Sequence, residues 1–265
     1  MIKLILAVAF IATLASDSKA QQAPDPRIAD IAHSGKIRIG VFPATQYSKD
    51  PKTGEQKGLA LDISRALAAR AGVAEVITVE HPNPVAVVAC VRAGGCDLGF
   101  IGLEPARLTE VDFTPAFIRR DFTYLVPAGS SIRSAADADR SGVRIVAARG
   151  HASTTALVRA LKQTKAVLAE DVEPAFELLR TGGADAFASV REVVLRYSAQ
   201  LPGSRVLDDA YDTSLVAIAI QKGRAGWLAY VSEFLDEAKR SGWMRQSIER
   251  AGLRGFDVIT QKTTN

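Results

Sequence analysis

The amino-acid sequence predicts an α/β fold built from two similar lobes. Strand-like and helix-like segments alternate along the 265 residues, which are enough to form two modest hydrophobic cores. A short pattern also occurs twice, as RAGGCDLGF at 92–100 and as RTGGADAFA at 180–188. Each copy combines a helix end, a Gly-Gly turn, an aspartate and the start of a strand, and glycine suits the left-handed end of a helix. A single Gly-Gly turn is common, but its recurrence in a β-α-β setting favours two related lobes.

In the first half of the chain, apolar runs and helical spacing predict alternating elements. These are a strand at 36–41, a helix at 61–71, a helix at 84–92 and a strand at 98–102. The first helix is expected to stop at Gly72. Asn83 and Pro84 are a capping residue and a first-turn proline, so the second helix is expected to begin there.

The second half repeats this order. The expected elements are a strand at 143–149, a helix from about residue 153, a helix at 171–180 and a strand at 184–188. Two further strand-like segments, 121–127 and 215–220, are expected to carry the chain from one lobe to the other. The segment 226–253 has a helical apolar stripe and is broken at Ser241 and Gly242.

These crossings define the expected domains. The first lobe is discontinuous and takes in 28–121 and 217–258, the second covers 122–216, and 259–265 is a polar tail. No low-complexity linker separates the segments, so the two lobes are expected to be tightly joined.

Residues 1–20 are predicted to be a secretory signal peptide. Lys3 gives a positive start, the apolar run that follows is too short to span a bilayer, and Ser18 and Ala20 form a small-x-small cleavage site. Cleavage after Ala20 predicts an exported protein. The formal net charge of +4 comes from interspersed charges of both signs without an aromatic-rich basic stripe, so nucleic acid is not an expected partner.

The two cysteines, Cys90 and Cys96, lie in the segment CVRAGGC. An exported location permits a disulfide between them. The other interpretation is that both are small apolar residues packed in a core. Neither a cluster of histidines nor one of acidic residues lies nearby, so no metal and no cofactor are expected.

Four loops follow the four predicted strands, and these are the expected binding elements. They are 42–47, 103–107, 150–154 and 189–191. In an open α/β sheet, ligands bind just beyond the carboxyl ends of the strands. We therefore expect the four loops to open toward one cleft.

Two of these loops suit an anion. The guanidinium of Arg107 can hold a carboxylate through two hydrogen bonds, unless Arg107 is an ordinary solvated surface arginine. The loop at 150–154, GHAST, begins a helix, whose free N–H groups and dipole favour negative charge. Ser153 and Thr154 would equally serve as plain helix caps, and capping is compatible with anion binding.

Six segments of the chain together resemble a known family. They are GKIRIGV at 35–41, GLALDISRALAARAGV at 58–73, EPARLTEVDFTPAF at 104–117, GHAST at 150–154, GGADAFAS at 182–189 and AIQKGRAGWL at 219–228. They resemble the periplasmic solute-binding proteins of family 3, the amino-acid-type receptors of ABC importers. The resemblance implies a type II periplasmic-binding-protein fold, with two open α/β lobes joined by two hinge strands and a ligand held between them.

The resemblance also implies a function and a set of site residues. A monomer in the periplasm would capture a small carboxylate-bearing solute for an inner-membrane ABC permease, without catalysis. Arg107 matches the family's carboxylate-binding arginine, the GHAST turn matches the backbone of the second lobe, and the loop 42–47 matches one that packs aromatic side chains on the ligand. The residues expected to bind the ligand are Phe42, Tyr47, Leu103, Glu104, Arg107, Gly150, His151, Ala152, Ser153, Ser189 and Val190.

The sequence departs from the family pattern at two positions. Glu104 stands three residues before the arginine, where these receptors usually carry threonine or serine. Val190 stands five residues after Asp185, where they usually carry the aspartate that binds the ligand's ammonium. Either Glu104 replaces that aspartate, or the ligand has no α-ammonium in the usual place; Glu104 is alternatively a partner of Arg107 when no ligand is bound. The sequence therefore does not single out an ordinary amino acid.

Two other functions are compatible with the same fold. Periplasmic dehydratases acting on prephenate or arogenate share it, and in such an enzyme Glu104 would be a general acid. An accessory protein of a periplasmic oxidoreductase system would use the fold as an interaction module. No Ser-His-Asp arrangement, Gly-x-Ser-x-Gly elbow or His-Glu-x-x-His motif is present, which favours a binding protein.

Overall fold

One mixed sheet runs through the whole molecule. The computed structural model describes residues 25–42, 47–50 and 52–260, so the expected signal peptide at 1–20, most of the loop at 42–47 and the end of the tail lie outside the described residues. The order of neighbouring strands is β4-β1-β5-β12-β7-β10-β8-β9. This arrangement confirms the predicted α/β class.

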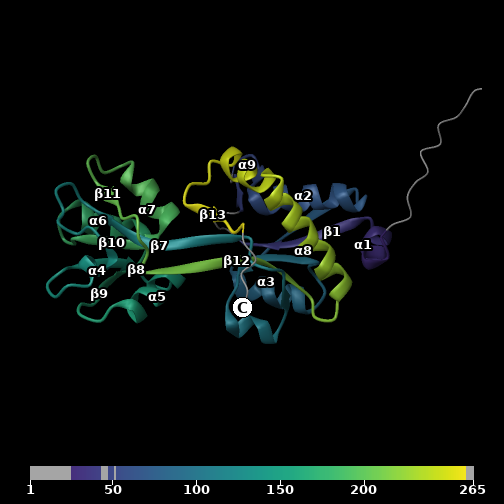
Figure 1. Cartoon of the computed structure of the whole chain (residues 1–265), viewed down its shortest axis with the longest axis horizontal. Coiled ribbons are helices and arrows are strands. Elements are labelled where there is room, and N and C mark those ends of the chain that lie inside the picture. Colours follow the sequence, from purple (N-terminus) through teal and green to yellow (C-terminus); the bar gives the residue numbers. More distant parts are fainter. Residues whose placement is uncertain (1–24, 43–46, 51, 261–265) are drawn as a thin grey trace, which may run out of the picture.

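Two long antiparallel strands form the middle of this sheet. They are β7 (Ile118–Val126) and β12 (Asp212–Ile220), paired from Asp212 opposite Phe122 to Val216 opposite Ile118. Figure 1 shows them spanning the gap between two groups of helices and strands. β12 continues into the first group by pairing with β5, and β7 continues into the second by pairing with β10. The proposed lobe boundaries, near residues 121 and 217, both fall within these two strands.

The first group contains three parallel strands and most of the helices. The strands are β1 (Lys36–Val41), β4 (Glu75–Glu80) and β5 (Leu98–Gly102), and the helices are α1 (Ala29–Ser34), α2 (Leu59–Ala71), α3 (Pro84–Arg92), α8 (Ala225–Arg240) and α9 (Trp243–Arg250). A large apolar core joins the sheet to α2, α8 and α9. α8 and α9 are separated at Gly242, which has the left-handed φ of 78° that glycine tolerates.

The second group repeats the plan. Its strands are β8 (Ile145–Ala148), β9 (Ala166–Ala169) and β10 (Ala186–Val190), and its helices are α4 (Ala135–Ala138), α5 (Ala152–Ala160), α6 (Val172–Arg180) and α7 (Arg191–Ser198). Two apolar clusters are built from alternate side chains of this half of the sheet.

Short elements complete the described fold. They are 3-10 turns η1 (Pro26–Ile28) and η2 (Pro105–Thr109), and strands β2 (Ser48–Lys49), β3 (Gln56–Lys57), β6 (Asp112–Phe113), β11 (Arg205–Val206) and β13 (Phe256–Val258). β11 and β13 both pair with β7, so the C-terminal segment returns to the central strands.

The repeated Gly-Gly-x-Asp pattern has the same structural role in each half. Asp97 accepts hydrogen bonds from the backbone N–H, Nε and Nη2 of Arg38, at 2.8 Å, 3.0 Å and 2.8 Å. Asp185 accepts the same three bonds from Arg144, at 2.9 Å, 3.1 Å and 2.5 Å. In each half the aspartate therefore ties the end of a helix to the neighbouring parallel strand. The two halves share this structural detail as well as their topology.

Candidate functional site

A cleft of about 350 Å³ lies beside the two central strands. It is lined by Phe42, Pro84, Gly102, Glu104, Arg107, Arg120, Phe122, His151, Ala152, Ser153, Val190, Val193, Ser214 and Val216. These residues come from both groups of elements. The first residues of α3 and α5 are among them, and these two helices lie on the same side of the central strands (Figure 1).

The floor of the cleft follows from the strand register. Val216 is paired with Gly102, Ser214 with Arg120, and Phe122 with Val190. Directly paired residues of antiparallel strands project from the same face of the sheet. All six belong to the cleft lining, so one face of β5, β12, β7 and β10 forms a continuous floor.

Arg107 projects from the turn η2 at the end of β5. Its side chain is only 15% exposed and its Nη1 donates a 2.7 Å hydrogen bond to the carbonyl oxygen of Gly102. Its Nη2 lies 3.1 Å from Oε1 of Glu104, whose side chain is 52% exposed. Arg107 and Glu104 therefore form an ion pair, one of the roles anticipated for Glu104. These two contacts hold the positively charged guanidinium at the wall of the cleft.

A second arginine, which the sequence analysis did not single out, also lines the cleft. Arg120 lies in the middle of β7, and its Nε donates a 2.8 Å hydrogen bond to Oε1 of Glu192. Its Nη2 contacts the same oxygen. The side chains are 19% and 6% exposed, so this is a largely buried ion pair between a central strand and the first turn of α7.

The start of α5 lines the same cleft from the second group of elements. His151 precedes the helix as its N-cap, but no side chain caps the helix end. The hydroxyl of Thr154 instead donates to the carbonyl of Ala148. Tyr211, whose pKa is raised by burial, donates a 3.2 Å hydrogen bond to the carbonyl of Ser153 and holds this turn in place. The first N–H groups of a helix have no partner within the helix, so they are available to an anion in the cleft.

The structure brings most of the predicted ligand-binding residues together. Phe42, Glu104, Arg107, His151, Ala152, Ser153 and Val190 all belong to the cleft lining. Gly150 is exposed in the turn that precedes this lining, and Leu103 is half-buried, with its N–H bonded to the carbonyl of Leu215. Ser189 is buried beside Val190 and points away from it, because successive side chains of a strand alternate between faces.

Tyr47 was expected in the cleft and lies elsewhere. Its side chain is 2% exposed and belongs to the apolar core of the first group. Burial raises the pKa of Tyr47 to about 12, with Glu80 as a further contributor. Of the two aromatic side chains expected on the ligand, Phe42 is the one that lines the cleft, and residues 43–46 lie outside the described part of the chain.

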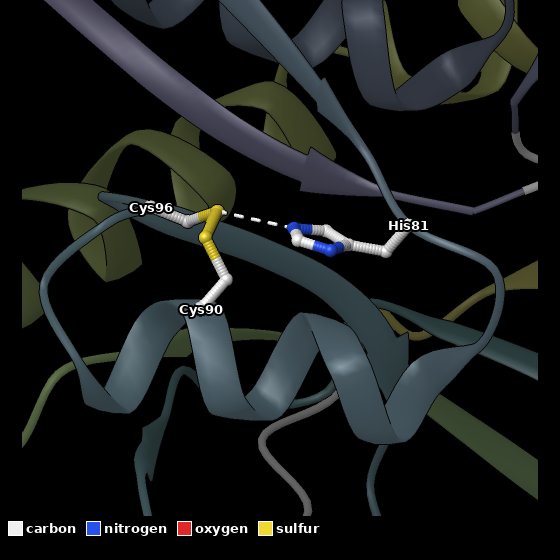
Figure 2. Close-up of side chains that lie close together, drawn as sticks. All are labelled: His81, Cys90 and Cys96. Carbon is white, nitrogen blue, oxygen red and sulfur yellow. Dashed lines mark hydrogen bonds between the residues drawn. A yellow bond between two sulfur atoms is a disulfide. The ribbon is translucent and has the colours of Figure 1, made fainter.

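Of the two interpretations of the cysteines, the disulfide is the one observed: it joins Cys90 and Cys96, whose Cα atoms are 5.3 Å apart. Figure 2 shows the ring of His81 pointing toward it, with Nε2 3.7 Å from Sγ of Cys96. Within the described residues, these three side chains are the one group of histidine, cysteine or acidic residues spaced for a metal ion. Metals bind thiolates, and both sulfur atoms are here bonded to each other. The cluster is therefore a packing unit against α3.

A second, larger depression lies away from these residues. It has a volume of about 570 Å³ and runs along α8 and α9, beside Phe234, Trp243 and Ala66. One of its charged residues, Glu237, is paired with Arg70. Its polar lining among the described residues is Glu237, Arg240 and Ser241, which all come from the end of α8, whereas a small-molecule site needs polar groups that converge for orientation. The cleft beside the central strands is the better candidate.

Two α/β units carried on a pair of long strands, with a charged cleft beside those strands, define the class of two-lobed solute-binding proteins. The chain belongs to the bacterial extracellular solute-binding proteins, family 3, which residues 37–252 match. Within the described residues, no helix combines the length and the apolar character needed to cross a membrane.

Individual relatives agree with this assignment. The chain is 25% identical to the glutamine-binding protein of Geobacillus stearothermophilus over 197 residues, which are 72% of this chain and 75% of that protein. Its fold is similar to that of an ancestral cationic amino acid solute-binding protein, with a TM-score of 0.71, 25% identity, and coverage of 83% of this chain and 97% of that one. It is also similar to an ancestral cyclohexadienyl dehydratase, with a TM-score of 0.58, 25% identity, and coverage of 84% and 95%.

Proposed function

We propose that this protein is the periplasmic substrate-binding component of an ABC importer and captures a small carboxylate-bearing solute, an amino acid or a related compound, in the cleft between its lobes. The observation that carries the proposal is that Arg107 of one lobe and the uncapped start of α5 of the other line the same cleft. A carboxylate between them would receive a charged hydrogen bond from one lobe and backbone N–H groups from the other.

Binding of this kind would draw the lobes together. A ligand shifts a conformational equilibrium only through its different affinities for the two states, and contacts with both lobes exist only in the closed one. Periplasmic binding proteins are known to close around their ligands by bending at a hinge. The strands β7 and β12 are the proposed hinges, since they join the two groups of elements. The protein is expected to act as a monomer and to deliver its ligand to an inner-membrane permease.

The likeness to a dehydratase makes an enzyme the second candidate. In that reaction Glu104 would have to donate a proton. Glu104 is instead half-exposed, and its Oε1 is already paired with Nη2 of Arg107 at 3.1 Å. The relatives described above also include a glutamine-binding protein and an ancestral amino acid receptor, which supports binding without turnover.

A thermal-shift screen tests the proposal. Small carboxylates, with and without amino groups, are compared with their uncharged amides at equal concentration. At least one carboxylate is expected to raise the melting temperature by mass action. Prephenate and arogenate are included, and the reaction mixture is examined for product. Turnover of either compound would replace the binding function with the enzymatic one, and a screen in which no carboxylate stabilises the protein would contradict the proposal.

A further inference from the structure

We propose that the cleft selects solutes with two anionic groups, one held by Arg107 and the second by Arg120. This inference rests on the proposed function and narrows its ligand to a chemical class, for which a small dicarboxylate is the simplest example. Arg120 would then be a specificity-determining residue that acts from the floor of the cleft.

Arg120 faces the cleft because of the strand register. It is directly opposite Ser214 in the β7–β12 pair, and both residues belong to the cleft lining. Its neighbour Arg119 projects from the other face, where it pairs with Asp121 and with Asp257. The two consecutive arginines thus have different surroundings, and only Arg120 is available to a ligand in the cleft.

The guanidinium of Arg120 is held in place, but only part of its hydrogen-bond donors are engaged. Its Nε and Nη2 both donate to Oε1 of Glu192, and its centre lies 5.6 Å from the centroid of the Phe256 ring. Within the described residues, no hydrogen bond is made by Nη1. A guanidinium has several donor edges, so one edge can bind Glu192 while the Nη1 side binds a second anion.

Glu192 is not among the residues that line the cleft. Its side chain is 6% exposed and faces a separate depression beside Gly252 and Leu253. The ion pair is therefore oriented, with its cationic end toward the cleft and its anionic end away from it. We regard Glu192 as a positioning residue, since it holds the guanidinium without lining the cleft.

A short series of neighbouring residues links the two arginines along the floor of the cleft. Gly102 connects them: a Cβ atom built there would lie 3.7 Å from Nη1 of Arg107 and 3.8 Å from Oγ of Ser214. Ser214 is in turn the direct cross-strand neighbour of Arg120. Because glycine leaves this point open, a ligand can extend along the floor from Arg107 past Ser214 to Arg120.

The charges of the lining favour a dianion over a zwitterion. Two arginines line the cleft, while the acidic residue among the lining side chains is Glu104, which is already paired with Arg107. Val190 offers no charge to an ammonium. A monocarboxylate would leave the free edge of Arg120 without a partner, whereas a second carboxylate would satisfy it.

Titration calorimetry with matched acids tests the inference. Succinate is compared with butyrate, and glutarate with valerate, so that each pair differs chiefly in the second carboxylate. We expect each dicarboxylate to bind about tenfold or more tightly than its partner, as for the loss of a charged hydrogen bond. Arg120→Gln should abolish this preference, by weakening the binding of succinate and glutarate far more than that of butyrate and valerate. Arg119→Gln, the matched control on the opposite face, should keep the preference.

A double variant guards against misfolding. Arg120→Gln alone leaves Glu192 buried without its partner, so Arg120→Gln/Glu192→Gln is measured beside it and should also bind both acids of a pair equally. Equal binding of both acids by the unmodified protein, or an equal loss for both acids in the variants, would overturn the inference but leave the proposed function standing. If none of the four acids binds, the inference is overturned, and the thermal-shift screen decides separately whether the proposed function stands.

Discussion

Replacing Arg107 with alanine is expected to remove most of the ligand affinity and little of the stability. In the folded protein, the side chain makes one hydrogen bond to the Gly102 carbonyl and one ion pair with the half-exposed Glu104. The first is worth about 1 kcal/mol and the second less than about 1 kcal/mol. The free energy of unfolding without ligand should therefore fall by less than about 2 kcal/mol.

The loss in binding should be larger. A ligand carboxylate in the Arg107→Ala variant would keep the N–H groups of α5 but lose its paired cation in a partly dry cleft. Removing one partner of such a pair costs about 2–5 kcal/mol, or roughly 30-fold to several thousandfold in Kd. The assay is titration calorimetry with the strongest carboxylate from the screen, and unfolding in urea gives the stability.

Arg92→Ala is the matched control for this experiment. Arg92 belongs to the same half of the protein and also forms an ion pair, with Glu110, but it is exposed and lies outside the cleft lining. This variant should bind like the unmodified protein. If Arg107→Ala kept the affinity, or if Arg92→Ala lost as much, the assignment of the carboxylate to Arg107 would be refuted.

Three further variants test other parts of the account. Glu104→Gln should abolish calorimetric binding of a zwitterionic ligand but spare or strengthen that of a plain carboxylate, and unchanged zwitterion binding would show that Glu104 is not the ammonium partner. Replacing both cysteines with alanine opens a short covalent loop and should lower the free energy of unfolding in urea by about 2 kcal/mol, whereas no change would exclude a stabilising disulfide. The hydrogen bond from Arg144 lowers the pKa of Asp185 in the folded protein. The ionised Asp185 therefore stabilises the fold at pH values above the unfolded-state pKa of about 3.9, and this stabilisation is lost as the pH falls through the lowered pKa of the folded state. Asp185→Asn should therefore be less stable than the unmodified protein at pH 7, by less than about 1 kcal/mol given the exposure of both side chains, and this difference should vanish near pH 2; a constant difference would contradict it.

The strongest local signals in the sequence predicted the fold well. Strand β1, strand β5 and helix α3 have the predicted bounds, since each is a continuous apolar run or is marked by the cap and proline at Asn83 and Pro84. The side chain of Asn83 accepts a hydrogen bond from the N–H of Ala86, as expected of an N-cap. The repeated Gly-Gly-x-Asp pattern also predicted two related halves, although it did not predict the arginine partners of the two aspartates.

Elements without such signals were missed. β4 and β9 are the strands at the two ends of the strand order, and their side chains do not alternate between buried and exposed positions. α7 begins directly after β10 without a capping side chain, because its N-cap is Val190. The strand predicted at 184–188 is instead β10, Ala186–Val190, and the strand predicted at 143–149 is shorter at both ends. In these regions the tertiary pairing, rather than local propensity, sets the bounds.

In the candidate site, too, local sequence signals indicated some residues, while others depend on tertiary pairing. Arg107, Glu104 and the start of α5 lie in loops after predicted strands and line one cleft, since those positions follow from the general geometry of open sheets. Arg120 was missed because its role depends on pairing with a strand about a hundred residues away. The available signal was the run of three charged residues, Arg119, Arg120 and Asp121, inside the crossing strand. Tyr47 was misplaced because an aromatic residue in a loop carries no indication of which side of the sheet it packs against.

Small-angle scattering with and without a bound carboxylate tests the central claim most directly. The claim is that one ligand contacts Arg107 on one lobe and the start of α5 on the other, so that binding brings the lobes together about β7 and β12. We predict a smaller radius of gyration when the strongest ligand from the screen is saturating, and no change in the Arg107→Ala variant at the same concentration. Tight binding at unchanged radius in the unmodified protein would contradict the account.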